Sequence, residues 1–437
     1  MHLSTTQYTL IQSSLSLLNT FIPLVAGILL DSLGARFSSI SASLFILVGQ
    51  YLVYASTIHL SWVYMCLGRL LYGVGSGALM VIQEGLLSLW FNRSGGLALA
   101  LGLHIACSRL AAYLATVAVY PIIRYSGFFG TPFLIGFYLC FVSFLANIYY
   151  LYLAKTHPPF SLDQHESHQE KATGMKNRWL SIHALQYFPH AFWAGMAVTA
   201  LLGANWTSFL HINTDVIHQR MSHTQQNTNQ GMEEAAWMAG WAQLLPVLLA
   251  PIIGWMYARI GHRVDFIALS ALLFSLSALC LCTGIPTPSL LAMILFSMSL
   301  SLGPLALMSS FPMILPQHKI GTAYGVYKSV MNTGITLADL LIGVLVDYTA
   351  SYDIVMVFYM IIGMVAFVIA MTWMRRGWHG RMMNQTHSAL SSAQLWQESM
   401  DTEQQGMGWF PVKICAGAMI LSWLAFILLF YSSLSLV

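Results

Sequence analysis

The chain has 437 residues, of which only 8% are charged and 57% are hydrophobic. A soluble chain carries about a quarter charged residues, so the composition excludes a soluble globular enzyme, a disordered protein and a disulfide-rich secreted module. The net charge of +3 is too small to indicate a nucleic-acid partner. The composition therefore predicts an all-α protein that crosses a lipid bilayer many times.

Apolar runs give the predicted membrane spans in chain order, because each span needs about 20 mostly apolar residues. The first five runs cover 8–30, 38–58, 62–90, 96–122 and 131–154. The next six cover 184–212, 235–257, 264–284, 288–314, 320–348 and 352–374, and a last run covers 413–436. These twelve runs predict an N-terminal bundle at 1–154, a cytosolic linker at 155–183, a C-terminal bundle at 184–375, a polar cytosolic segment at 376–412 and an extra helix at 413–437.

The distribution of Lys and Arg predicts the orientation. Thirteen of the 18 basic residues fall in loops on the side of the loop at 31–37, and two fall on the other side. Positive charge is retained on the cytosolic side of membrane proteins, so the 31–37 loop is predicted to be cytosolic. On this topology we expect no glycan at the three Asn-x-Ser/Thr sequences, which begin at Asn92, Asn205 and Asn384.

A four-residue pattern occurs twice, at offsets 0, 4, 7 and 9, in a short cytosolic loop after a span. The first copy consists of Gly27, Asp31, Gly34 and Arg36, and the second consists of Gly254, Ala258, Gly261 and Arg263. Glycines permit a tight turn and close helix approach, and the charges can hold neighbouring helix ends. The pattern predicts a duplicated bundle of the kind that many transporters use.

The two copies predict that the N-terminal bundle lacks its first helix. Two spans precede Gly254 but only one precedes Gly27, and four follow each motif before the next polar stretch. The helix at 413–436 then lies outside the repeat. Either the chain starts late, which we favour, or the 413–436 helix fills the vacant position.

These residues resemble the major facilitator superfamily. The first copy of the pattern resembles its loop motif, and Arg69-x3-Gly73-x-Gly75-x-Gly77 resembles its second signature. A closer likeness, to the lysosomal dipeptide transporters of that superfamily, is carried by 68–75, 108–110, 316–325 and 332–334. Two positions depart from the pattern, because Gly77 stands where the family has a buried acid and Met308 stands where we would place its tryptophan.

The resemblance implies a two-bundle fold and facilitative uniport of dipeptides from lysosome or vacuole to cytosol. The plasma membrane is the second location that we expect. It also implies a homodimer and an accessory lysosomal glycoprotein that shields an unglycosylated transporter. Both motifs are predicted to act in gating, through Gly27, Asp31, Gly34, Arg36, Arg69, Gly73, Gly75, Gly77, Gly254, Gly261 and Arg263.

Ionisable groups inside predicted spans are costly and are functional hypotheses by default. Glu84 and Lys328 lie at comparable depth on helices of different halves, about 10 and 13 Å from the cytosolic ends. We therefore predict an ion pair that forms when the pathway is shut to the cytosol; the alternative is that each group reaches the membrane interface separately.

The substrate-binding residues are predicted to be Arg109, Glu84, Lys328, Asn332 and Asp339. Arg109 lies near mid-membrane, where its planar fork suits the carboxylate of a peptide C-terminus; the alternative is a partner in a buried network. Asp339 shares a helix face with Lys328 and Asn332, and either accepts an amino group or packs near the far side. His104 is expected to be a hydrogen-bonded core residue, and Arg69 to hold the bundle together.

The sequence therefore predicts a secondary transporter of a small zwitterion or cation that works by alternating access. Glu84 and Asp339 could serve proton coupling, although nothing demands it. The second reading changes the cargo to a monocarboxylate or other organic anion. The third is a transporter-like partner or receptor that transports nothing. We expect no cofactor, metal or catalysis, because the glycines at 73–77 lie in an apolar helix and follow no strand.

Overall fold

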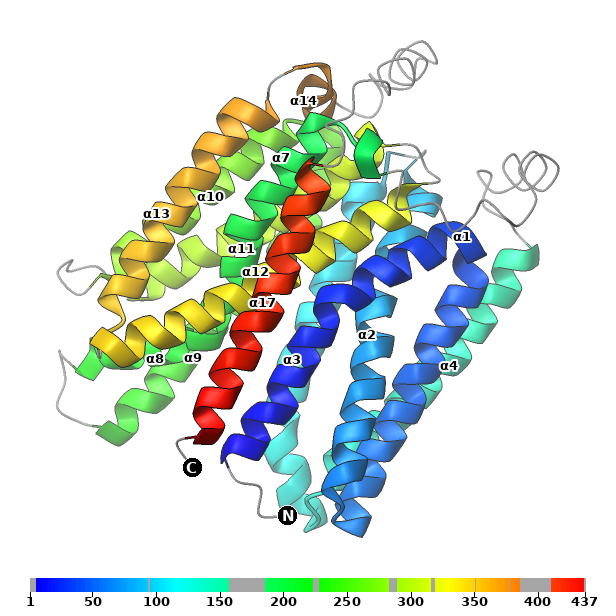
Figure 1. Cartoon of the computed structure of the whole chain (residues 1–437), viewed down its shortest axis with the longest axis vertical. Coiled ribbons are helices and arrows are strands. Elements are labelled where there is room, and N and C mark those ends of the chain that lie inside the picture. Colours follow the sequence, from blue (N-terminus) through cyan, green and yellow to red (C-terminus); the bar gives the residue numbers. More distant parts are fainter. Residues whose placement is uncertain are drawn as a thin grey trace.

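The structure is a computed structural model, and it describes nine stretches of the chain. They are residues 5–92, 95–156, 185–222, 228–282, 289–315, 319–349, 351–375, 377–385 and 410–435. Within these stretches nearly every residue is helical, and the helices gather into two bundles that lie side by side (Figure 1). The predicted all-helical two-bundle fold is confirmed.

Among the described residues, the N-terminal bundle has four helices, the first of which has two limbs. The helices are α1 (Thr5–His59), α2 (Trp62–Phe91), α3 (Leu97–Ser126) and α4 (Thr131–Thr156). Gly34 divides α1 with φ 82° and ψ 166°, a backbone conformation that strains other residues. Its counterpart in the second copy of the motif, Gly261, also has a positive φ of 73° and ends a helix. Both motif glycines therefore make the turn that their spacing predicts.

The C-terminal bundle has six spanning units. After a short turn, η2 (Leu185–Tyr187), the first unit is α7 (His190–Val198), the π-turn η3 (Thr199–Gly203) and α8 (Ala204–Ser222). The others are α9 (Thr228–Ile260), α10 (Arg263–Leu281), α11 (Ser289–Ile314), α12 (Ile320–Thr349) and α13 (Asp353–Ile369), which continues as the π-turn η5 (Ala370–Met374). The described residues beyond this bundle form the short α14 (Gly377–Asn384) and α17 (Phe410–Ser435).

Nine of the described helices are long and apolar enough to cross a membrane. The prediction of twelve spans counts the two limbs of α1 separately and includes both α7–α8 and α17. The polar segment predicted at 376–412 contains α14, a short helix that the sequence analysis does not predict. The remainder of that segment, at 386–409, and most of the 155–183 linker lie outside the described residues.

The two bundles differ in how completely they are packed. In the C-terminal bundle α7–α8 packs against α9, α12 and α13, which the repeat equates with the first limb of α1, α3 and α4. The N-terminal bundle instead contains a pocket of about 940 Å³. The second limb of α1, α2, α3 and α4 line this pocket, through residues that include Gln83, His104 and Asn147.

The structure contradicts the idea that the 413–436 helix fills the vacant position. The described part of α17 packs against α12 and the first limb of α1 instead of against α3 and α4, and Figure 1 shows it across the front of the junction between the bundles. Trp423 donates a hydrogen bond to Thr20 Oγ1 at 3.0 Å and its ring contacts Phe21. α17 is almost uniformly apolar, which suits a position beside lipid.

Glycines let the two bundles approach at two crossings. At the α1–α12 crossing, a Cβ on Gly27 would clash with the Gly321 carbonyl group. A Cβ on Gly325 would clash with the Pro23 carbonyl oxygen, at 2.6 Å. At the α3–α9 crossing, a Cβ on Gly254 would lie 2.4 Å from the carbonyl oxygen of Ala98. Gly27 and Gly254 are the first residues of the two motif copies, so each copy contributes one close crossing between bundles.

The α3–α9 crossing gives a direct test. We expect Gly254→Val to lower the thermal unfolding midpoint by several degrees, because an overpacked contact costs about 1–3 kcal/mol. The control is Gly240→Val on the same helix, where a Cβ would meet nothing within 4 Å. Tryptophan fluorescence of the detergent-solubilised protein measures both midpoints, and equal midpoints for the two variants would contradict the close crossing.

Candidate functional site

Asp31 of α1 caps the first turn of α12, a helix of the other bundle. Its Oδ1 accepts a hydrogen bond from the Gly321 amide at 2.9 Å. Its Oδ2 accepts hydrogen bonds from the Thr322 amide and hydroxyl, both at 2.6 Å. The first amides of a helix have no partner within the helix and carry partial positive charge, so a carboxylate satisfies them well. Asp31 therefore ties the cytosolic ends of the two bundles together.

Glu84 of α2 and Lys328 of α12 form the predicted ion pair. Lys328 Nζ lies 2.7 Å from Glu84 Oε1, and the two side chains are 13% and 2% exposed. The ion pair itself is thus confirmed, and the alternative that each group separately reaches the membrane interface is wrong for this state. Its role as a gate stays a prediction.

Further along α12, polar contacts continue across the same junction. Ser329 Oγ accepts a hydrogen bond from the Leu24 amide at 3.1 Å, and Asn332 Nδ2 donates one to the Asn19 carbonyl oxygen at 2.9 Å. Two acceptors beside these contacts, Asn19 Oδ1 and Glu84 Oε2, are buried without a hydrogen-bond partner among the described residues. Unsatisfied buried acceptors are costly, so these two atoms are candidates for contact with a bound molecule.

The structure is closed on the predicted cytosolic side. The Asp31 cap, the ion pair and the glycine crossings described above all lie between mid-membrane and the cytosolic ends of α1, α3, α9 and α12. Beyond them, nearly all side chains of α3 from 107 to 115 are exposed, on every side of the helix. This arrangement corresponds to an outward-facing state of an alternating-access protein.

Arg109 lies on this exposed part of α3. Its side chain is half-buried, and no described residue forms an ion pair or hydrogen bond with it. The alternative role in a buried network with Gln83 finds no support within the described residues. An unpaired guanidinium at membrane depth is a candidate carboxylate ligand.

Asp339 has partners in its own bundle. Ser208 of α8 donates a hydrogen bond to its Oδ1, and His211 Nδ1 lies 3.1 Å from its Oδ2. The site residues predicted from the sequence therefore fall in three places: Glu84, Lys328 and Asn332 together at the junction, Asp339 farther along α12, and Arg109 on α3.

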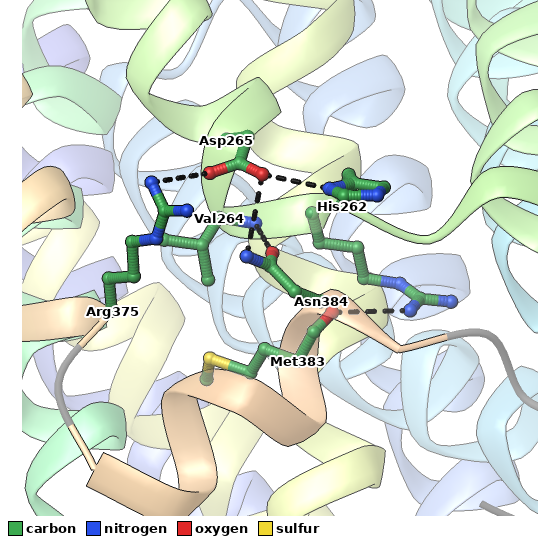
Figure 2. A network of polar contacts seen from close by, with 7 residues as sticks. His262, Val264, Asp265, Arg375, Met383 and Asn384 are labelled. Carbon is green, nitrogen blue, oxygen red and sulfur yellow. Dashed lines mark hydrogen bonds and ion pairs between the residues drawn. The ribbon is translucent and has the colours of Figure 1, made fainter. Parts of the chain in front are cut away.

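The second copy of the motif holds α14 instead of capping a helix. Arg263 is buried and donates to Ser309 Oγ and to the carbonyl oxygens of Met383 and Gln385. Asn384 accepts a hydrogen bond from the Val264 amide through its side chain at 2.8 Å, and from the His262 amide through its carbonyl at 2.9 Å. Figure 2 shows Asp265 completing this network, beside His262, Asn384 and Arg375.

The remaining predicted motif residues have packing environments. Gly73 is buried, and a Cβ on Gly75 or Gly77 would meet atoms of α1 at 2.6 or 2.5 Å. Arg36 is exposed in the turn of α1.

Two further residues with expected structural roles, Arg69 and His104, lack contacts that would support those roles. Arg69 Nε is buried without a hydrogen-bond partner among the described residues, and its role in holding the bundle together stays a prediction. His104 lines the 940 Å³ pocket, where no hydrogen bond to a described residue satisfies it as predicted.

Sequence reasoning missed several partners in these contacts. Thr322 and Ser329 are polar residues within an apolar helix, and Asn19 lies within an apolar run. Nothing in the sequence distinguishes them from other small polar residues of membrane helices. His211 carried a signal that was overlooked, because it is an ionisable residue inside a predicted span. All three Asn-x-Ser/Thr asparagines have partners within the protein, namely Pro312, Leu201 and Asp265.

Two helical bundles closed on one side by buried polar contacts, with ionisable side chains at membrane depth between them, define a secondary transporter and not an enzyme. The model of the Major Facilitator Superfamily matches residues 1–222 and, in a second copy, residues 220–437. The chain belongs to this superfamily. One copy of the duplicated motif lies in each of the two matched halves.

Curated relatives and solved structures agree with this assignment. The chain is 23% identical to the lysosomal dipeptide transporter MFSD1 of Danio rerio over 357 residues, which cover 79% of this chain and 74% of that protein. It is 21% identical to the protein of that name in Homo sapiens, over 79% of this chain and 73% of the other.

Two solved structures show the same fold. The E. coli fucose:proton symporter FucP in the outward conformation matches with a TM-score of 0.63 at 16% identity, over 88% of this chain and 92% of that chain. The human organic anion transporter MFSD10 matches with a TM-score of 0.59 at 16% identity, over 83% of each chain.

The ion pair is tested by exchanging its charges. Glu84→Lys and Lys328→Glu should each lower the thermal unfolding midpoint, because removing one partner of a buried pair costs about 3–5 kcal/mol. The double variant should recover most of the loss. Fluorescence-detected unfolding in detergent measures the cycle.

A mismatched double variant, Glu84→Lys with Lys413→Glu, is the control, since Lys413 is exposed on α17. The control should not recover stability. A charge-swapped double variant no more stable than either single variant would show that the two charges do not interact.

Proposed function

We propose that this protein is a facilitative transporter that carries dipeptides from the extracytosolic side to the cytosol by alternating access. The observation that carries the proposal is the placement of opposite charges at membrane depth on α3 and α2 of the N-terminal bundle, where Glu84 also contacts α12 of the other bundle. Arg109 on α3 is a cation without a described partner, and Glu84 Oε2 is a buried acceptor without one. A dipeptide is a zwitterion, so its carboxylate suits Arg109 and its ammonium suits the acceptors near Glu84.

The junction between α1, α2 and α12 supports a role for the amino-group acceptors. Asn19 Oδ1 and Glu84 Oε2 both lack a hydrogen-bond partner from the part of the chain that the structure describes. A bound ammonium group donates up to three hydrogen bonds. It could therefore donate to both of these acceptors. The curated relatives are named dipeptide transporters, and this name supports the same class of cargo.

The lysosomal or vacuolar membrane is the proposed location, on the names of these relatives alone. Uniport is part of the proposal because the cargo carries both charges itself, so that the site needs no coupling ion to stay near neutrality.

The experiment is counterflow of labelled alanyl-alanine into proteoliposomes that contain the purified protein. Counterflow needs no knowledge of the physiological direction. We expect Arg109→Ala to reduce the rate by about tenfold or more, equivalent to about 1.4 kcal/mol of lost interaction. Arg109→Lys should recover part of it, since an ammonium keeps the charge but loses the fork. Arg124→Ala, an exposed arginine on the same helix, is the control.

Competition identifies the cargo class. Unlabelled dipeptides should compete, and dipeptides with a blocked amino terminus should compete poorly. Competition by simple carboxylates but not by dipeptides would overturn the proposal in favour of an organic-anion transporter. Absence of both counterflow and dipeptide binding would favour a partner protein that transports nothing.

A further inference from the structure

His211 and Asp339 form an ionisable pair in the extracytosolic half of the C-terminal bundle. The two side chains come from α8 and α12, and they are 54% and 38% exposed. His211 Nδ1 lies 3.1 Å from Asp339 Oδ2, while Ser208 holds the other carboxylate oxygen. The pair is therefore positioned by hydrogen bonds, and part of each side chain stays uncovered by the described residues.

The helical register of α12 shows which way Asp339 points. It lies on the same face as Lys328 and Asn332, which contact α2 and α1 of the other bundle. Leu341 and Val344, on the opposite side of α12, are exposed apolar residues that suit lipid. Asp339 lies about 15 Å from the extracytosolic end of α12 at 1.5 Å per residue. The pair is thus inside the membrane and directed toward the junction between the bundles.

Few other charges surround the pair. The nearest ionisable groups by sequence on α8 are Asp215 and His218, and on α12 the next one toward the cytosol is Lys328, which Glu84 neutralises. Further titratable residues occur on α12 itself and on the helices that pack against α8 and α12. They are Tyr359 and Asp353 on α13, Glu233 and Glu234 at the start of α9, and Asp347 near the end of α12. No Lys or Arg occurs in residues 1–30 or 414–437, which include the first limb of α1 and most of α17.

We propose that His211 and Asp339 form a proton-binding site whose occupancy allows the extracytosolic side of the transporter to close. The inference rests on the proposed function and deepens it. In the neutral imidazole, Nδ1–H donates to Asp339 and Nε2 is free, so a proton from extracytosolic water adds at Nε2. The pair then changes from a net charge of minus one to zero.

The physical reason is the cost of burial. Closing the extracytosolic side brings the two bundles together over this face of α12 and removes water from the pair. An uncompensated carboxylate is expensive to bury, whereas an imidazolium–carboxylate pair is compensated. An imidazole changes its charge between about pH 5 and pH 8, so an acidic extracytosolic compartment would favour closure and hence delivery of cargo to the cytosol.

The experiment measures alanyl-alanine counterflow in proteoliposomes at matched internal and external pH, from 5.5 to 7.5. An imidazole changes its charge between about pH 5 and pH 8, so we expect the wild-type rate to fall severalfold as the pH rises over this range. His211→Gln should flatten the profile, and Asp339→Asn should flatten it and lower the rate. His218→Gln, the next histidine on α8, should behave like the wild type.

The outcomes separate this inference from the proposed function. If the wild type transports the dipeptide and His211→Gln keeps the same pH profile, the proton site is wrong and the proposed function stands. If the wild type does not transport the dipeptide, the proposed function fails, and thermal unfolding then tests the proton site alone.

In the unfolding measurement the wild type should melt at a higher temperature at pH 5.5 than at pH 7.5, because the protonated imidazole attracts Asp339. His211→Gln should reduce that difference and His218→Gln should retain it. An undiminished difference in His211→Gln would overturn the inference without any reference to transport.

Discussion

The arrangement of the two bundles depends on a pair of opposite charges that neither bundle can bury alone. Glu84 and Lys328 come from opposite bundles and are almost completely removed from solvent. In a low-dielectric interior each charge is costly unless the other stays in contact. Opening the cytosolic side must separate α2 from α12, so it must also supply water or another charge to both groups. On the proposed function, a zwitterionic cargo supplies charges of both signs and eases that separation.

The duplicated motif has diverged into two devices with different chemistry. In the first copy Asp31 reaches across to cap α12, a contact that can be withdrawn as the bundles move. In the second copy Ala258 has no such group, and the α3–α9 crossing relies on close packing at Gly254. Arg263 instead anchors α14 through backbone carbonyl groups. Both crossings are therefore closely packed at glycines, but only the α1–α12 crossing adds a carboxylate cap, which makes it the more sensitive to competing charges.

Much of this fold could be predicted from the sequence, because long apolar runs and a repeated glycine pattern obey simple rules. The break at Gly34 follows from a glycine in a short polar loop between two apolar runs, and Glu84 and Lys328 were matched by depth on their helices. The position of α17 could not be predicted, since a uniformly apolar helix has no amphipathic pattern that shows which of its faces packs against other helices. The contacts of Asn19 and Asn384 depend on long-range register between distant segments, which single-residue patterns do not encode.

Lys328 and Asp339 place two ion pairs at different depths on one helix, and their partners differ in kind. Lys328 pairs with α2 of the other bundle, so its pair is buried only while the cytosolic side is closed. Asp339 pairs with α8 of its own bundle, so we expect its pair to persist in either state and only its access to water to change. On the proposed mechanism, the first pair resists opening on one side because separation exposes charge. The second resists closure on the other side unless its net charge is zero. A single rigid helix can therefore couple the two sides, since rotating α12 away from α2 at one end brings Asp339 toward the opposite bundle at the other.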